Sequence, residues 1–173
     1  SKHSDVNKVD DHGRTPLFHT ICNGKLETAK WLLSVGASLK IVDIYHLNLL
    51  HVVCKSSLSS NNKSFELFIW LYNYGFKEIR GKTKSGNTPM FFACMKGNLK
   101  ICKWLFQHGA HTDIRTPNDN EITPLCISCA EEQYQIVKWL LTTPAVEDFY
   151  DHENKRLLLF NNDINKGLIK MDI

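Results

Sequence analysis

Cys126 and Cys129, three residues apart, are the side chains whose spacing most suggests a metal site. Structural zinc takes four cysteine or histidine ligands, so this pair would need two more at suitable spacing. No second pair of this kind exists, and no histidine lies between residues 112 and 151. Both cysteines also fall on an expected helix, at positions where small side chains pack. We therefore predict that they are core residues and expect no metal ion.

The eight histidines do not form a catalytic arrangement that sequence positions can reveal. No Ser/His/Asp set, Cys/His pair or pair of carboxylates can be assembled from these positions. The glycines mark turns and do not form a phosphate-binding loop. His108 and His111 flank an expected helix end, where a positive charge is favourable. We predict that the chain is not an enzyme and binds no cofactor.

The six cysteines admit two interpretations, disulfides or buried thiols. Four lie in or beside apolar helix positions, where reduced cysteine serves as a small apolar residue, so we favour thiols in an intracellular protein, cytoplasmic or nuclear. No apolar run is long enough to span a membrane. The first residues also lack the apolar segment of a signal peptide.

A repeat supplies the elements that would position all these residues. Residues 86–110 read GNTPMFFACMKGNLKICKWLFQHGA, and parts of this stretch recur along the chain. Thr-Pro occurs at 15–16, 88–89 and 123–124. The tryptophans occupy one repeat position at spacings of 39, 34 and 35 residues: Trp31, Trp70, Trp104 and Trp139. Such a period marks stacked supersecondary units that share a continuous core.

Each unit is predicted to contain a helix, a turn, a second helix and an extended finger. In the first unit, Thr15 caps a helix over 17–22 with Pro16 at its first position, and a second helix covers 26–35. We expect one domain, divided into a tail of a preceding repeat (1–10), repeat 1 (11–42), degenerate repeat 2 (43–82), repeat 3 (83–115), repeat 4 (116–146) and a C-terminal cap or tail (147–173). The tail at 1–10 leads us to expect a piece of a longer protein.

Repeats 2 and 4 and the C-terminal segment depart from the pattern. In repeat 2, Asn48-Leu49 replaces Thr-Pro, so a weaker helix start is expected. The insertion at 57–63, SLSSNNK, has the composition of a solvated loop. Repeat 4 carries Glu121 and Glu132 in place of glycine, and residues 156–160 suit a short capping helix.

These units resemble the ankyrin repeat family. The resemblance rests on DHGRTPL at 11–17, NG at 23–24, KLE at 25–27 and GA at 36–37, and on the matching positions of repeat 3. It covers about residues 5–146. It implies an all-α fold, a solenoid of stacked helix-turn-helix units with extended, hairpin-like fingers.

One family position is altered in most units. The family usually has a histidine two residues after the proline, which ties the turns of adjacent units together. Here the position holds Phe18, His51, Phe91 and Cys126, so we expect apolar contacts in three of the units. Cysteine also replaces small residues of the family's first helix, which explains half of the cysteines as packing residues.

The resemblance implies that a partner protein or peptide binds the concave face formed by the fingers and first helices, and we expect a monomer in isolation. By analogy, the contact positions flank each turn and end each first helix. The candidates are His12, Arg14, Asn23, Tyr45, Leu47, Lys55, Lys84, Asn87, Met95, Lys96, Asn120 and Glu131. Tyr45, Leu47 and Met95 would be apolar anchors. Equally, Tyr45 and Leu47 would serve to cover the start of repeat 2.

Two surface features leave alternatives open. Basic residues dominate 76–103 and acidic residues dominate 117–153, which is either a solvated surface or a pattern that orients a partner of complementary charge. The tryptophans are predicted to pack between second helices on the convex side, and the alternative is an exposed aromatic ladder.

The resemblance also admits a second function, a regulatory or substrate-recruiting segment of a larger enzyme or channel, for example a kinase or a protein acyltransferase. A weaker third hypothesis is that the lysines of repeat 3 bind nucleic acid or anionic membranes. The net charge of only +3 argues against a nucleic-acid partner.

Overall fold

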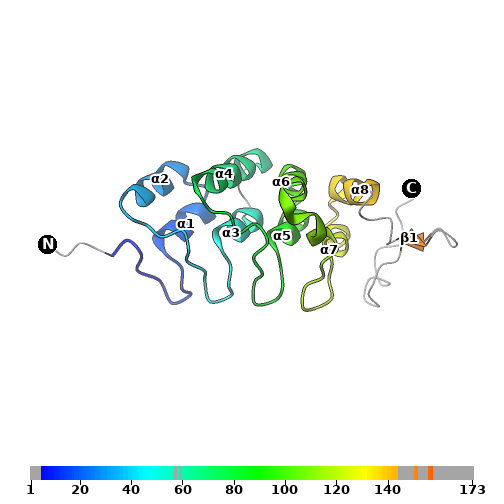
Figure 1. The fold of residues 1–173 in the computed structure, drawn as a ribbon, viewed down its shortest axis with the longest axis horizontal. Helices are drawn as coiled ribbons and strands as arrows, with labels where there is room; N and C mark the ends of the chain where they lie inside the picture. Colours follow the sequence, from blue (N-terminus) through cyan, green and yellow to red (C-terminus); the bar gives the residue numbers. More distant parts are fainter. Residues whose placement is uncertain (1–4, 57, 59, 144–149, 152–155, 158–173) are drawn as a thin grey trace.

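The computed structural model describes residues 5–56, 58, 60–143, 150–151 and 156–157. Its helices come in consecutive pairs: α1 (Pro16–Cys22) and α2 (Leu26–Ser34), α3 (Leu49–Lys55) and α4 (Asn61–Tyr74), α5 (Pro89–Met95) and α6 (Leu99–Leu105), and α7 (Pro124–Ala130) and α8 (Tyr134–Thr142). Figure 1 shows the first helices in one row beside the fingers and the second helices in another. The fold is an all-α repeat solenoid.

The helix starts follow from the recurring Thr-Pro. Thr15, Thr88 and Thr123 each accept a hydrogen bond on their hydroxyl from the N–H three residues later, at 3.2, 3.3 and 3.2 Å. Proline follows each threonine at the first helical position, where it has no hydrogen bond to lose. The sequence prediction of these caps is confirmed.

The predicted weak start of repeat 2 is wrong. Asn48 caps α3 by accepting from the His51 N–H at 2.9 Å, and its own N–H donates to His51 Nδ1 at 3.1 Å. The two bonds form a reciprocal capping box, which satisfies two helix-end donors at once. Asparagine and histidine together therefore replace what Thr-Pro provides in the other repeats.

The insertion is not entirely a solvated loop. Ser60 caps α4 by accepting from the Lys63 N–H at 3.3 Å, so residues 61–63 belong to the helix. Aligned on the tryptophan position, Phe65 of α4 matches Leu26 of α2 and Leu99 of α6. The insertion thus adds one N-terminal turn to α4, because its serine and asparagines suit a helix start.

Two segments follow less regular paths. After α6 the chain runs through the π-helical turn η1 (Phe106–Ala110) and the 3₁₀ turn η2 (His111–Ile114), and the helix is interrupted at Gly109, where φ is 102°. At the C-terminal end, β1 (Tyr150–Asp151) pairs antiparallel with β2 (Arg156–Leu157). The capping helix expected over 156–160 is therefore wrong at its first two residues, whose backbone pairs with a neighbouring strand. Residues 158–160 and Pro144 lie outside the described residues.

The core is one continuous stripe along the stack. It includes Leu17 and Ile21 of α1, Leu50 of α3, Met90 of α5 and Ile136 of α8, all with no more than traces of exposed surface. The six cysteines are free thiols, and Cys54, Cys94, Cys102 and Cys126 are buried within this core. Burial raises the pKa of the Cys54 and Cys102 thiols, which keeps them protonated and apolar.

The tryptophans do not all pack as predicted. Trp104 of α6 packs edge-on against Phe68 and Tyr72 of α4, the second helix of the preceding repeat, with ring centroids 5.2 and 4.6 Å apart. Trp139 packs against Phe106 in the same way, at 5.8 Å. Trp31 is 61% exposed, so its predicted packing is wrong. Trp104 and Trp139 both contact the repeat that precedes their own. Trp31 has no such contact because the described residues contain no second helix before α2.

Candidate protein-binding face

Each finger is closed by a polar residue at a fixed position, and these residues are Asp10, Asp43, Thr83 and Asn118. The N–H of each donates to the carbonyl four residues later, at 3.0 to 3.2 Å. The Asp10, Asp43 and Asn118 side-chain oxygens also accept from the N–H groups two and four residues later, at 2.9 to 3.0 Å. Each finger is therefore a tight, internally bonded turn.

A backbone ladder joins the fingers of adjacent repeats. The Ile44 N–H donates to the His12 carbonyl at 2.9 Å, the Lys84 N–H to the Tyr45 carbonyl at 2.9 Å, and the Asp119 N–H to the Ser85 carbonyl at 3.1 Å. The same step is thus repeated from finger to finger. It fixes the spacing of the tips before any partner binds, which lowers the entropic cost of association.

Side chains reinforce this ladder. Arg14 donates to the buried carboxylate of Asp43 in the next finger, with Nη2 and Oδ2 3.2 Å apart, and its guanidinium lies over the Phe18 ring. Asn118 Nδ2 donates to Asn87 Oδ1 at 2.9 Å. Arg14 and Asn87, both predicted contact residues, are therefore engaged within the protein.

The other predicted contact residues at the fingers divide sharply by exposure. Leu47 is only 5% exposed, so of the two interpretations of this residue the structure agrees with the one in which it covers the start of repeat 2. Tyr45, by contrast, is 51% exposed. His12, Lys84 and Asn120 are also exposed, one on each of the other three fingers.

A second row of predicted residues lies where the first helices end. Asn23, Lys55, Lys96 and Glu131 are exposed, and Met95 is half-buried. The Lys55 ammonium lies over the Phe92 ring of the next repeat, 5.7 Å from its centroid. We call the exposed finger residues and this second row together the finger–helix face: His12, Tyr45, Lys84, Asn120, Asn23, Lys55, Met95, Lys96 and Glu131.

His51 joins the first helix of repeat 2 to the end of the same repeat. Its Nε2 donates to the Gly81 carbonyl at 2.8 Å, while Nδ1 accepts from Asn48. Because the ring is fully buried, desolvation of the charged form lowers the pKa of His51 to about 4, against the opposing effect of its bond to Gly81. These hydrogen bonds stay within repeat 2, and the contact with repeat 3 is an edge-on packing of the His51 ring against Phe92, with ring centroids 5.9 Å apart.

Sequence reasoning missed the polar residues that hold the repeats in register. Arg80 donates to Asp113 Oδ1 and Thr112 Oγ1, at 2.9 and 2.8 Å, and so links repeats 2 and 3. Burial raises the pKa of Asp113, although the Arg80 guanidinium opposes this shift. Asp43 and Asn118 were also missed, and a polar residue recurring before each turn was the available signal.

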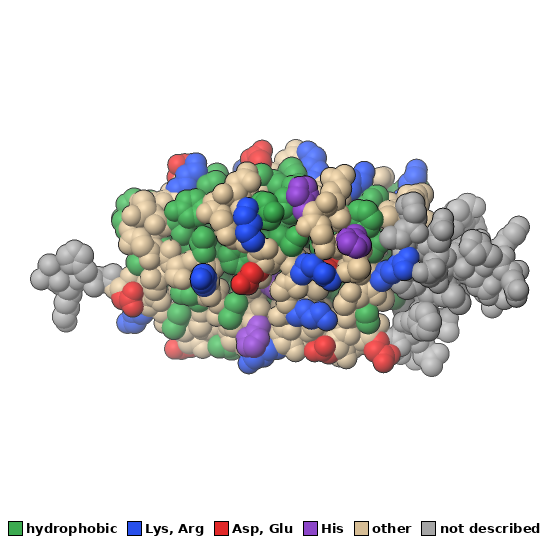
Figure 2. Space-filling model, in the orientation of Figure 1, with side chains coloured by type: hydrophobic (Ala, Val, Ile, Leu, Met, Phe, Trp, Pro, Cys, Tyr) green, Lys and Arg blue, Asp and Glu red, His purple; other side chains and the backbone are tan. Residues whose placement is uncertain are grey.

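Charge is unevenly distributed along the finger–helix face. Lys55, Lys84 and Lys96 are exposed in the two middle repeats, whereas Asp119, Glu121 and Glu131 are exposed in repeat 4. Along the lower edge in Figure 2, where the fingers lie, acidic side chains are visible toward both ends of the described residues. The face therefore changes sign along the stack.

The described residues do not form a metal site or a membrane span. Among the described residues, no three His, Cys, Asp or Glu side chains come together in a way that could hold a metal ion. Cys126 lies 3.1 Å from the Thr123 hydroxyl in the core, and burial raises the pKa of Cys129 to about 11. None of the described helices is long and apolar enough to cross a membrane.

Comparison with known proteins agrees with this architecture. The family model for three copies of the ankyrin repeat matches residues 50–154, and the model for a single ankyrin repeat matches residues 12–44. The chain is also similar to the Homo sapiens transient receptor potential cation channel subfamily A member 1, with 30% identity over 95 residues. That stretch is 54% of this chain but only 8% of the channel protein. On its repeated sequence, its stacked helix pairs and these matches, the chain belongs to the ankyrin repeat family.

Proposed function

We propose that this chain binds a partner protein or peptide on its finger–helix face. Ankyrin repeats generally mediate protein–protein interaction, and domains built from them are typically non-catalytic interaction modules. The observation that carries the proposal is the finger ladder, which holds exposed tips at a fixed spacing. A surface organised before binding loses little conformational entropy when the partner arrives.

The charges of the face support a partner of a particular pattern. Lys55, Lys84 and Lys96 would attract an acidic stretch, and the acidic residues of repeat 4 would attract a basic one. Tyr45 is the exposed aromatic residue of this face, on the finger of repeat 2 beside the basic side chains, and aromatic side chains are favoured at the centres of interfaces. We therefore expect an extended segment with acidic residues followed by basic residues.

A peptide library displayed on phage tests this proposal. Peptides selected on the chain are titrated calorimetrically against Tyr45→Ala/Lys96→Ala, for which we expect affinity to fall by roughly 10- to 100-fold. The matched control is Tyr74→Ala/Lys103→Ala on the second helices, since Tyr74 and Tyr45 are about equally exposed, at 50% and 51%. Equal losses for both double variants, or a loss only for the control, would exclude this face.

The comparison with a channel protein favours a second candidate. The chain would be a segment of a larger channel or enzyme, in which the same face recruits or regulates. Sequencing of the complete transcript that encodes this chain tests this second candidate function. An open reading frame that includes membrane-spanning or catalytic domains would support it, and one without them would refute it.

A further inference from the structure

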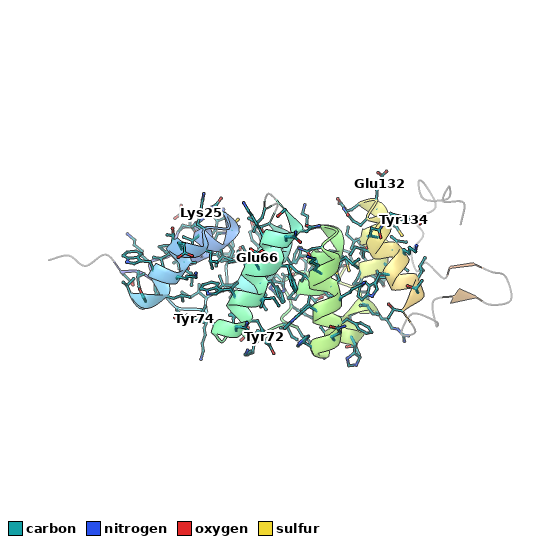
Figure 3. All side chains as sticks on the ribbon, turned by 90° about the horizontal axis from the view of Figure 1, so that it is seen from above. Lys25, Glu66, Tyr72, Tyr74, Glu132 and Tyr134 are labelled. Atoms are coloured by element: carbon teal, nitrogen blue, oxygen red, sulfur yellow. The ribbon has the colours of Figure 1, made fainter. Side chains whose placement is uncertain are left out.

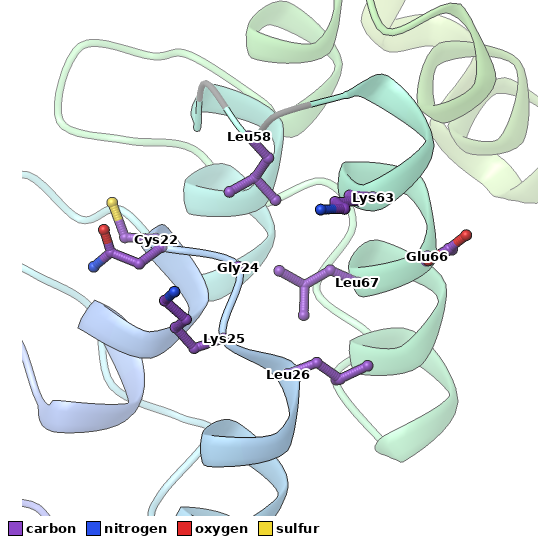
Figure 4. A pocket seen from close by; sticks show the side chains of 9 residues that line it. Cys22, Gly24, Lys25, Leu26, Leu58, Lys63, Glu66 and Leu67 are labelled. Atoms are coloured by element: carbon purple, nitrogen blue, oxygen red, sulfur yellow. The ribbon is translucent and has the colours of Figure 1, made fainter.

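A cavity of about 500 Å³ lies between the turn that joins α1 to α2 and the N-terminal half of α4. Figure 4 shows Leu67 of α4, Leu26 of α2 and Leu58 around it. Lys25 and Lys63 stand at its rim, on opposite sides. Ligand pockets commonly have volumes of roughly 300–1,000 Å³, with apolar walls and a few polar groups.

The insertion in repeat 2 explains why the cavity exists here. The extra turn of α4 is bound toward α6, because Asn61 donates to the Gly97 carbonyl at 3.1 Å and Lys100 donates to Asn62 at 2.8 Å. Figure 3 shows α4 lying close beside α6, with α2 set further away. Between repeats 3 and 4, the Gln133 side chain lies directly against Gly97.

Leu58 partly covers the side toward α2. A Cβ added at Gly24, whose φ is +64°, would lie 2.9 Å from Leu58 Cδ2, so leucine and turn are already in contact there. Leu67 is buried, whereas Leu26 and Leu58 are half-buried. An apolar ligand would therefore cover leucine surface that still meets water.

The charge at the rim is positive. Lys25 and Lys63 are exposed, and neither takes part in a salt bridge within the described part of the chain. Glu66 is the carboxylate of the lining, and in Figure 4 it points away from the cavity. Glu27, at the start of α2, pairs with Lys30 at 2.7 Å. The N-terminus of α2 has no side-chain cap, which adds partial positive charge.

We propose that this cavity binds a medium-chain aliphatic carboxylate. The chain of the ligand lies against Leu26, Leu58 and Leu67, and its carboxylate pairs with Lys63, while Lys25 adds positive charge on the opposite side of the rim. A water molecule occupies about 30 Å³ in the liquid, so a cavity of about 500 Å³ has room for roughly seventeen heavy atoms, enough for a carboxylate with a chain of about ten carbons. This site is separate from the finger tips and does not depend on the function proposed above.

Titration of the ¹⁵N-labelled chain with decanoate, followed by amide chemical shifts, tests the proposal. We expect saturable shifts confined to residues 22–26 and 63–67. Decan-1-ol, which has the same apolar chain but no charge, is expected to bind roughly tenfold more weakly. Lys63→Glu is expected to weaken decanoate binding by a similar factor, while Lys103→Glu, the same change on α6, leaves it unaltered.

Leu58→Trp provides a second variant that fills the cavity without changing its charge, and it is expected to abolish the shifts. Circular dichroism of each variant shows that the fold is retained. Shifts spread over the whole surface, equal binding of decanoate and decan-1-ol, or equal effects of the two lysine variants would overturn the proposal. An absence of saturable binding to the unmodified chain would also overturn it.

Discussion

His51 is a fully buried polar side chain with both ring nitrogens hydrogen-bonded. It caps its own helix through Nδ1 and bonds the end of its own repeat through Nε2, and it does both as a neutral ring. Phe18 and Phe91 occupy the same position in repeats 1 and 3 and are buried there without an ionisable group of their own. The same repeat position is therefore occupied either by a phenylalanine or by a hydrogen-bonded histidine, and only the histidine can gain a proton.

The stability of the protein should consequently fall on acidification through His51. Folding lowers the pKa of this residue from 6.5 to about 4, so the unfolded chain binds the proton more tightly. The contribution of neutral His51 to the free energy of unfolding is complete above pH 6.5. As the pH falls toward 4, this free energy decreases by roughly 2–3 kcal/mol. Urea denaturation of His51→Phe should show a flatter pH dependence over this window. His12→Ala, at an exposed histidine, should keep the original dependence.

Glu121 illustrates a local conflict between residue type and backbone. Its φ is 60°, in the left-handed region that costs most non-glycine residues energy, and Gly86 holds the equivalent place in repeat 3. We expect Glu121→Gly to stabilise the protein by roughly 0.5–1 kcal/mol. Glu131→Gly is the control, because Glu131 has a negative φ of −95° and glycine there should destabilise. The unfolding temperatures of both variants, compared with that of the unmodified chain, test this expectation. A lower unfolding temperature for Glu121→Gly would contradict it.

At the scale of the elements, short helices depend on their ends. A seven-residue helix such as α3 forms few internal bonds, so its caps and its packing determine its stability. Asn48 caps α3 and also donates to the Glu78 carbonyl at 3.3 Å, so it joins the helix start to the end of the same repeat. Thr15 caps α1 with its hydroxyl alone.

Asn48→Ala should therefore cost more than Thr15→Ala. We expect a loss of about 2 kcal/mol for the asparagine and about 1 kcal/mol for the threonine, since the first change removes a cap and a second buried bond. The free energies of unfolding come from chemical denaturation under identical conditions. If the two losses were equal, the bond to Glu78 would contribute nothing to stability.

At the scale of the whole molecule, each repeat is stable only through its neighbours. Asp43 is the clearest link, because its buried carboxylate closes one finger and pairs with Arg14 of the preceding one. In a stacked array, weakening one boundary loosens the terminal repeat more than the central ones.

Asp43→Ala should thus release repeat 1 selectively. Hydrogen exchange followed by mass spectrometry is expected to show faster exchange in α1 and α2, with α5 and α6 much less affected. The exposed Asp11 provides the control, and Asp11→Ala should leave exchange unchanged. Uniform acceleration along the chain would mean that the repeats unfold as one cooperative unit.

Much of the architecture could be predicted because short sequence patterns determine it. Thr-Pro positions located three helix starts, and the Trp spacing counted the helix pairs. The errors occurred where a local signal was ambiguous: Asn48 looked like a poor cap until its partner His51 was considered. The polar composition of SLSSNNK suggested a loop, although serine and asparagine equally begin helices. Trp31 lacks the preceding second helix against which Trp104 packs.

The sequence by itself determined the repeat, the type of fold and the rows of residues that the fingers and first helices present. These follow from periodicity and helix-end chemistry, which act over a few residues. Only the tertiary structure decided which members of those rows remain free: Leu47 is buried, Arg14 and Asn87 bond across repeats, and Tyr45 faces solvent. The cavity beside α4 likewise arises from contacts between repeats. Such contacts join residues about thirty positions apart, and no local pattern records them.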